Sequence, residues 1–285
     1  MPKSGCFAGR SMRIYISADE EGISGVVGSL SPGGAGDEER SCRLMTQEVN
    51  AAIEGALEAG ATEVVVNDSH GSMRNLRIED INPEAVLIAG SPKPMGMMQG
   101  IDSRFDAVFL VGYHARMGTP GVWNHTISGG TVANIWVNDV VVGEAGLNAM
   151  IAGYYGVPVA MVTGDQCLAR EVHELMPWVE AVEVKQAITR YAAACLPPAK
   201  AHEAIRKGAG KALAGLGEAK PLTVKSPVKI TLQLRDTGQA EAAARLPGAE
   251  VVDPLTVAYA HSDFLGAVQG LDVMITLGQA GSFRR

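Results

Sequence analysis

Three short runs rich in β-forming residues constrain the fold of this chain more than any other feature. Residues 13–17 alternate in the way of a strand, while residues 62–66 and 107–111 are apolar runs without alternation. A strand without alternation is covered on both faces, which is typical of parallel sheets connected through helices. The three runs therefore predict a sheet buried between helices.

A helix is expected between the first two runs, over residues 37–59. Its apolar positions recur at helical spacing, and three acidic residues at 37–39 suit the positive end of the helix dipole. Gly60 stands where a helix commonly ends in a glycine. The strand–helix–strand order favours an α/β protein with a three-layer αβα core and a mostly parallel sheet.

The pattern changes after residue 131. Residues 132–137 and 140–142 predict a β-hairpin around the two-residue turn Asn138-Asp139, followed by a helix that closes near Gly156. Further along we expect a strand at 157–162, a helix at 199–216, a strand at 228–234, a helix at 239–245, strand and loop at 250–259, and a last helix at 262–277. The glycine- and serine-rich stretch 22–36 reads as a surface loop.

This pattern predicts three parts of the chain. Residues 1–11 are expected to be a flexible N-terminal extension, residues 12–206 a metal-binding catalytic α/β domain, and residues 207–285 a smaller C-terminal α/β portion. The boundary is placed in the alanine-rich, glycine-spotted stretch 207–217.

Carboxylates and imidazoles follow the predicted strands directly. Asp19 and Glu21 come after the first strand, His70 after the second and His114 after the third. The carboxyl ends of parallel strands share one edge, where ligands bind in open α/β sheets. Glu144 comes after the hairpin and opens the next helix. We therefore expect these five side chains to meet.

Each of these residues also has an ordinary interpretation when taken alone. An acidic pair at a strand end is usually a solvated turn, and a single histidine there is more often a hydrogen-bonded loop or core residue. Glu144 could simply serve the positive end of its helix. Placement of all five on one rim is what favours a functional site.

The composition of this set indicates the metal. Two imidazoles and three carboxylates without a thiolate suit zinc in a hydrolytic site, with manganese or cobalt as substitutes. A catalytic zinc takes three protein ligands, so five suit two ions that share a carboxylate, roughly 3.5–4 Å apart.

A further histidine lies in a loop rich in glycine and proline. His125 follows residues 118–121 and could act as a general acid or base, stabilise a developing oxyanion, or be an ordinary loop histidine. We interpret His173, His202 and His261 as surface residues.

Composition argues against other function classes. The formal net charge of −7 and the lack of a basic block disfavour nucleic-acid binding. No apolar stretch reaches the 18 residues of a membrane span, and residues 1–11 lack the apolar core of a signal peptide, so we expect a cytoplasmic protein without membrane contact. The four cysteines match no zinc-binding pattern and are expected to be reduced packing residues.

At these motifs the chain resembles the D-aminopeptidase family of zinc metallopeptidases (M55), formerly filed under dipeptide transport. The resemblance runs from about residue 12 to the last helix. It is carried by Ser17-Ala18-Asp19-Glu20-Glu21-Gly22-Ile23-Ser24-Gly25, Asn67-Asp68-Ser69-His70, Gly112-Tyr113-His114-Ala115, Thr119-Pro120-Gly121-Val122, and Val142-Gly143-Glu144 with Gly146-Leu147-Asn148-Ala149. Weaker pieces are Val184-Lys185-Gln186 and Pro198-Ala199-Lys200-Ala201.

The resemblance implies two zinc ions per chain, with Asp19 bridging them. It implies Glu21 and His114 on one ion, His70 and Glu144 on the other, and a catalytic role for His125. It also implies a ring-shaped homo-oligomer that encloses its active sites, with a decamer as the expected size.

The activity implied is hydrolysis of the N-terminal residue of a short peptide or aminoacyl amide. Nothing in the motifs distinguishes a D from an L side chain, because that preference depends on pocket shape. Two alternatives stay open: a cytoplasmic peptide-binding protein without turnover, and a metal-dependent amidohydrolase that acts on a non-peptide amide.

Overall fold

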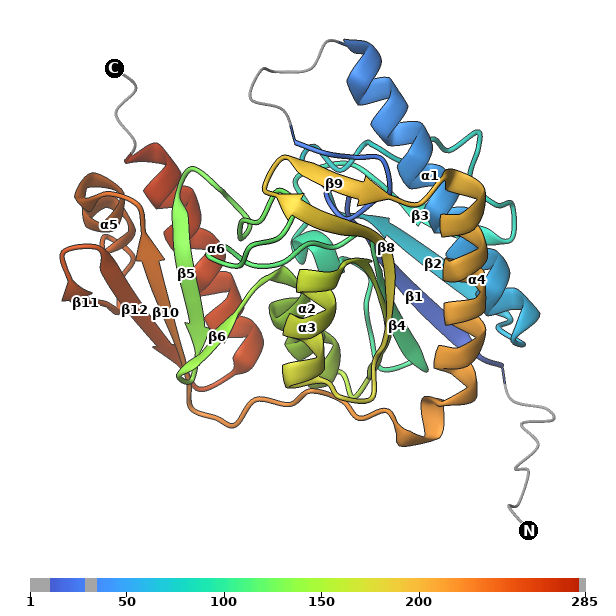
Figure 1. Ribbon diagram of the computed structural model, residues 1–285. Coiled ribbons are helices and arrows are strands. Elements are labelled where there is room, and N and C mark those ends of the chain that lie inside the picture. Colours follow the sequence, from blue (N-terminus) through green and yellow to red (C-terminus); the bar gives the residue numbers. More distant parts are fainter. Residues whose placement is uncertain (1–10, 29–34, 282–285) are drawn as a thin grey trace.

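The apolar runs of the sequence become neighbouring strands in a mostly parallel sheet. The structure is a computed structural model that describes residues 11–28 and 35–281 (Figure 1). Within these residues seven strands form the larger sheet in the order β3-β2-β1-β4-β7-β8-β9, in which only β9 is antiparallel to its neighbour. The strands are β1 (Arg13–Ala18), β2 (Glu63–Asp68), β3 (Ala85–Ile88), β4 (Ala107–Val111), β7 (Val159–Asp165), β8 (Glu180–Thr189) and β9 (Ala192–Cys195).

Helices cover both faces of this sheet. On one face lie α1 (Ala35–Glu58) and α4 (Pro198–Ala214), which pack side by side in Figure 1. On the other lie α2 (Glu144–Tyr154) and α3 (Gln166–Leu175). The β1 side chains alternate accordingly: Ile14 and Ile16 enter the core under α1 and α4, while Tyr15 enters the core on the other side. The predicted α/β class with a three-layer core is confirmed.

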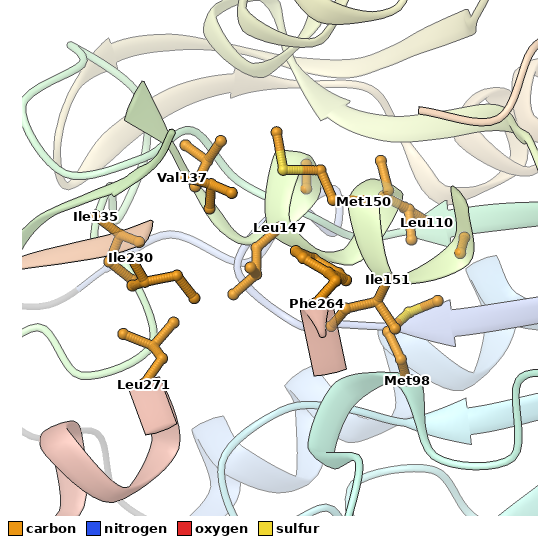
Figure 2. Packing of buried hydrophobic residues seen from close by; sticks show 14 of the residues in the cluster. Met98, Leu110, Ile135, Val137, Leu147, Met150, Ile151, Ile230, Phe264 and Leu271 are labelled. Atoms are coloured by element: carbon orange, nitrogen blue, oxygen red, sulfur yellow. The ribbon is translucent and has the colours of Figure 1, made fainter. Parts of the chain in front are cut away.

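A second, antiparallel sheet extends the core beyond α2. Its order is β11-β12-β10-β5-β6, with α5 (Thr237–Ala243) and α6 (Phe264–Ala280) packed on it. Its strands are β5 (Val132–Val137), β6 (Val140–Val142), β10 (Val228–Leu234), β11 (Ala249–Asp253) and β12 (Thr256–His261). Figure 2 shows the shared core, in which Leu147 and Ile151 of α2 lie with Phe264 and Leu271 of α6.

The predicted hairpin forms, but one of its strands pairs across the expected boundary between the two portions of the chain. Asn138 and Asp139 make the turn with positive φ angles of 45° and 70°. Strand β5 then pairs with β10, so the second sheet joins strands from both predicted portions. The expected boundary between residues 206 and 207 falls inside α4, which packs on the larger sheet. The division into two domains stays a prediction.

Two further outcomes concern the termini and loops. Residues 1–10, most of the predicted N-terminal extension, lie outside the described residues. Residues 22–28 were expected on the surface, yet most of them are buried; the rest of that stretch up to residue 34 is outside the described ranges. Among the described residues, no helix combines the length and apolar character that crossing a bilayer requires.

Candidate metal centre

The site begins where β1 ends between its two neighbours. Ala18 is in register with Asp68 of β2 and with Val111 of β4, so the three strands finish at the same level. Just beyond, the Ser69 N–H donates to the Ala18 carbonyl and the Asp19 N–H to the Val111 carbonyl, both at 2.8 Å. The strand order also reverses between β1 and β4, which is where open α/β sheets form ligand sites.

Glycines let the loops after β1 and β4 touch. Gly112 has a φ of +73°, and a Cβ there would collide with the Asp19 carbonyl oxygen. Gly22 donates its N–H to the Gly112 carbonyl at 2.7 Å, and a Cβ on Gly22 would collide with the Tyr113 carbonyl. Gly112 combines a positive φ with close backbone approach, which only glycine adopts at little cost, whereas at Gly22 the close approach alone leaves no room for a side chain.

The five predicted strand-end and helix-start residues converge. The Nδ1 of His70 lies 3.0 Å from Glu21 Oε2 and 3.3 Å from Asp19 Oδ1. The Nε2 of His114 lies 3.4 Å from Glu144 Oε1 and 3.6 Å from Asp19 Oδ2. Asp19, Glu21, His114 and Glu144 are buried, and His70 is partly buried.

His125 joins the same cluster from its loop. Its ring stacks on that of His114, with centroids 4.3 Å apart and planes 11° apart. Its Nε2 lies 3.7 Å from Glu21 Oε1 and 3.9 Å from Glu144 Oε1. The sixth candidate residue therefore faces two of the carboxylates while its side chain stays partly exposed.

Backbone carbonyls set the tautomers of two of these rings. The Nδ1 of His114 lies 3.0 Å from the Ala115 carbonyl and that of His125 lies 2.8 Å from the Trp123 carbonyl. A carbonyl only accepts, so each Nδ1 must carry the proton and donate. Each neutral ring then presents the Nε2 lone pair to the carboxylate cluster, which is how histidines are usually oriented toward a metal.

The electrostatics of the cluster favour positive charge at its centre. Burial disfavours the imidazolium of His70, but the carboxylates of Glu21 and Asp19 outweigh burial and raise its pKa to about 12. Burial acts in the same direction on His114, where Glu144 chiefly outweighs it and raises the pKa to about 10. The field that holds these protons would equally stabilise a divalent cation, and metal binding competes with protons for the same ligands.

The side chains of the cluster leave polar atoms without hydrogen-bond partners, and a metal ion would satisfy these atoms. Among the described residues, the buried Asp19 Oδ2 and His114 Nε2 have no hydrogen-bond partner. Buried polar atoms without a partner are rare and costly, and a metal ion bound between them would satisfy both atoms. Three groups of donor atoms within 4.8 Å of one another could hold an ion: Asp19 with Glu21 and His70, Asp19 with His114 and Glu144, and Glu21 with His114 and His125.

The three groups of donor atoms and their distances indicate which side chains could bind the same ion. Asp19, Glu21 and His114 each belong to two of the groups, and the bridging role expected of Asp19 stays a prediction. The shortest contacts pair His70 with Glu21 and His114 with Glu144. The partition implied by the resemblance pairs these residues the other way round, and it stays a prediction.

Glu144 also holds the loop that carries His125. Its Oε1 accepts a hydrogen bond from the Ile127 N–H at 2.6 Å. Ile127 has a positive φ of 58°, a conformation that is unfavourable for a β-branched residue and is typically maintained by its surroundings at functional sites. One carboxylate therefore contacts both the cluster and this strained backbone.

Sequence reasoning missed the residues that support the cluster from behind. The buried ammonium of Lys185 in β8 donates to the carbonyls of Glu21, Ile23 and Val26 at 2.5, 2.9 and 2.6 Å. These bonds explain why the stretch after Glu21 is buried and not on the surface. The only signal for Lys185 in the sequence is its place in a weaker motif of the resemblance.

A similar support lies behind His70. The Asp68 carboxylate accepts hydrogen bonds from the backbone N–H groups of Asn75 and Leu76 at 2.6 and 2.7 Å. The Asn75 side chain also donates to the His70 carbonyl at 2.6 Å. The loop after β2 is thus folded back so that His70 points to the cluster.

The other histidines and the cysteines lie elsewhere. Within the described residues, no group that could hold an ion includes His173, His202 or His261. Cys42 and Cys167 are buried free thiols and Cys195 is partly buried, while Cys6 lies outside the described residues.

Comparison with known proteins identifies the family. Residues 12–273 match the D-aminopeptidase family, Peptidase_M55. A D-aminopeptidase of Bacillus subtilis (strain 168) is 43% identical over 274 residues, which cover 95% of this chain and 100% of the relative. The fold is also similar to the solved structure of the Zn-dependent D-aminopeptidase DppA from Bacillus subtilis, which is described as a self-compartmentalizing protease. The TM-score is 0.92 and the sequence identity is 42%, and the match covers 96% of this chain and 100% of that one. This chain therefore belongs to the D-aminopeptidase family of peptidases.

Proposed function

We propose that this protein is a zinc-dependent aminopeptidase that removes the N-terminal residue, a D-amino acid, from short peptides or aminoacyl amides. The observation that carries the proposal is the buried cluster of three carboxylates and three imidazoles at the switch point of the sheet, with Asp19 Oδ2 and His114 Nε2 unpaired. The names of the similar proteins add zinc, the D configuration and peptide hydrolysis.

Five residues would hold two zinc ions per chain. Asp19 would be the shared ligand; the short contacts favour Glu21 with His70 on one side and His114 with Glu144 on the other. Manganese or cobalt could occupy the same oxygen and nitrogen donors. Bound at such a site, a pair of divalent cations polarises a carbonyl and lowers the pKa of water toward neutrality.

The protein's own contribution to the chemistry centres on His125. With Nδ1 donating to the Trp123 carbonyl, its Nε2 faces the cluster as a base for a proton released during attack on the peptide bond. Once protonated there, the same atom would donate to the oxyanion or return the proton to the leaving amine. The stacked ring of His114 and the Glu144–Ile127 hydrogen bond hold this loop in place.

We also propose that the chain assembles into a homo-oligomer. The similar DppA structure is described as self-compartmentalizing, and a ring that encloses its active sites would restrict substrates to short peptides. A decamer and a cytoplasmic location are the specific expectations.

One assay tests the proposal against its alternatives. The zinc-loaded protein is incubated with matched D- and L-alanyl dipeptides and amides, and with a non-peptide amide, before and after treatment with a chelator. We expect chelator-sensitive release of D-alanine that zinc restores. Tight peptide binding without cleavage would favour the peptide-binding protein, and cleavage of the non-peptide amide alone would favour the amidohydrolase; either result would contradict the proposal.

A further inference from the structure

A cavity opens directly beside the metal-ligand cluster. Its volume is about 380 Å³, and Glu144 and Ile127 lie in its wall. The remaining wall comes from α2, from α6 and from the segment around η1 (Gly96–Met98). The Glu144 carboxylate therefore belongs both to the cluster and to the wall of this cavity.

The wall of the cavity is mainly apolar. Met97, Leu147, Ile151 and Val273 contribute to it. Figure 2 shows Leu147 and Ile151 on α2 within the shared hydrophobic core, which fixes this side of the wall. Apolar walls with a few placed polar groups are the usual character of ligand pockets, and 380 Å³ lies within their ordinary range of roughly 300–1,000 Å³.

The charged groups of the wall do not suit an acidic ligand. Among the described residues, the wall holds one ammonium, that of Lys93, which donates to Asn67 Oδ1 and to the Asp68 carbonyl at 2.6 Å each. The other charged side chains in the wall are the carboxylates Glu144 and Asp272. With two carboxylates and one ammonium, the charged side chains of the wall carry a net negative charge, which disfavours an anionic side chain relative to an apolar one.

A buried amide gives the cavity a hydrogen-bond acceptor. Asn148 is buried in the wall, and its Nδ2 donates to the Tyr113 hydroxyl at 2.8 Å and to Met97 Sδ at 3.4 Å. Its Oδ1 accepts no hydrogen bond from the residues that the structure describes. An acceptor in this place suits an N–H group of a peptide or a free amine.

The wall is tied to the same strands as the cluster. The Met97 carbonyl accepts hydrogen bonds from Ser17 Oγ and from Asn67 Nδ2, both at 2.7 Å. Ser17 lies in β1, and Asp19 directly follows the end of that strand, so the cavity and the metal ligands share one rigid support. Methionine side chains adapt their shape to different apolar partners, so Met97 suits a pocket that takes more than one side chain.

We infer that this cavity is the subsite for an apolar side chain of the peptide substrate. The inference rests on the proposed aminopeptidase function and adds the class of side chain that is preferred. An apolar cavity of 150 Å³ already holds benzene, so about 380 Å³ accepts a side chain as large as leucine or phenylalanine. The side chain belongs to the N-terminal residue or to the one after it, and the two arms of the test separate these.

The test compares substrate panels between the wild type and a narrowed cavity. One arm varies the N-terminal residue in amides of D-alanine, D-leucine, D-phenylalanine and D-glutamate; the other varies the second residue in D-alanyl dipeptides. Val273→Trp narrows the cavity from a position that is 41% exposed, where the larger ring is tolerated. Val251→Trp, at a position in β11 that is 67% exposed and outside the wall, is the matched control.

In one of the two substrate series, we expect Val273→Trp to lower kcat/KM for the leucine and phenylalanine substrates. The loss should be about tenfold or more relative to the substrate with the smallest side chain in that series. Val251→Trp should leave that ratio unchanged. Met97→Ala, which enlarges the cavity, should shift the preference in the same arm toward the larger side chain. Unchanged ratios in both arms for both cavity variants would overturn the inference. Loss of the proposed function has a different signature, since the wild type would then release no amino acid from any substrate.

Discussion

His125 differs from the other five residues of the cluster in its position, which leaves it free to transfer a proton. Asp19, Glu21, His70, His114 and Glu144 each place a carboxylate oxygen or a ring nitrogen close to another member of this set, in the arrangement that an ion needs. His125 lies at the edge of the cluster, on a loop, with its side chain 19% exposed. A residue in that place can move a proton without releasing a ligand.

Replacing His125 therefore separates metal binding from turnover. We expect His125→Ala to keep the zinc content of the wild type and to lower kcat about 10²- to 10⁴-fold, the usual contribution of a general acid or base. His202→Ala, which removes a histidine of α4 outside the cluster, is the control and should leave both quantities unchanged. A His125→Ala protein with near-normal kcat would show that another group handles the proton.

Lys185 shows what the sequence could not reveal at this scale. A buried ammonium is costly unless its donors are satisfied, and here burial lowers its pKa to about 8. Three carbonyls of the segment after Glu21 satisfy it. The strand-end carboxylates and histidines were predictable because their chemistry is unusual at such positions, whereas a lysine about 160 residues away carries no sign of the carbonyls it will meet.

Removing that ammonium should loosen Glu21. We expect Lys185→Met to lower the free energy of unfolding by about 1–3 kcal/mol, because carbonyls stay buried without a donor, and to weaken zinc binding in the protein that remains folded. Denaturant unfolding and a zinc titration measure the two effects. Lys229→Met, at an exposed position of β10, is the matched control. Unchanged zinc affinity in Lys185→Met would mean that the lysine does not position Glu21.

At the scale of elements, the site depends on how closely the ends of β1 and β4 approach. The hydrogen bonds from Asp19 to Val111 and from Gly22 to Gly112 connect the two loops just beyond Ala18 and Val111, the last paired residues of the two strands. That contact brings the residues on either side, Asp19 and His114, into one cluster. Backbone geometry at the strand ends is therefore as important to the site as the ligand side chains.

Gly112 is the position where this contact is most sensitive. We expect Gly112→Ala to separate the two loops, because its φ of +73° is unfavourable for alanine and the new methyl group would collide with the Asp19 carbonyl. Zinc content and kcat/KM should both fall. Gly210→Ala in α4, where an added Cβ meets nothing within 4 Å, should be neutral or slightly stabilising. Wild-type zinc content in Gly112→Ala would contradict the close-approach argument.

The sequence predicted elements well where one local pattern decided them. The apolar strands, helix α1 and the hairpin with its Asn138-Asp139 turn lie close to the expected ranges. No element was predicted for residues 166–195, yet α3, β8 and β9 lie there. Strand β8 mixes buried and exposed positions without strict alternation, so it is recognisable only once α3 and α4 pack beside it. Its pattern reflects tertiary contacts and not a local period.

For the whole molecule, the fold class was predictable and the arrangement of its two sheets was not. Alternating strands and helices determine a layered α/β architecture. The pairing of β5 with β10 joins segments about 90 residues apart, and no local signal in either strand selects that partner. The second sheet matters for function because its helix α6 supplies part of the wall of the substrate cavity.

At the same scale, the candidate site could be predicted from the sequence as a set of residues but not as a geometry. The structure brings Asp19, Glu21, His70, His114 and Glu144 together, with His125 beside them. Their roles as ligands and proton carrier stay predictions. The hydrogen bonds that orient the rings of His114 and His125 go to backbone carbonyls, which no side-chain pattern records.

The most direct test of the two-zinc centre is the zinc content of the purified protein, measured by elemental analysis with the Asp19→Ala variant in parallel. Asp80→Ala, at an exposed loop position, is the matched control. The bridging role expected of Asp19 predicts two zinc ions per chain in the wild type and in Asp80→Ala, and loss of both ions with all hydrolysis in a folded Asp19→Ala protein. A wild-type protein that hydrolyses D-aminoacyl peptides without zinc, or an Asp19→Ala protein that keeps both ions, would contradict it.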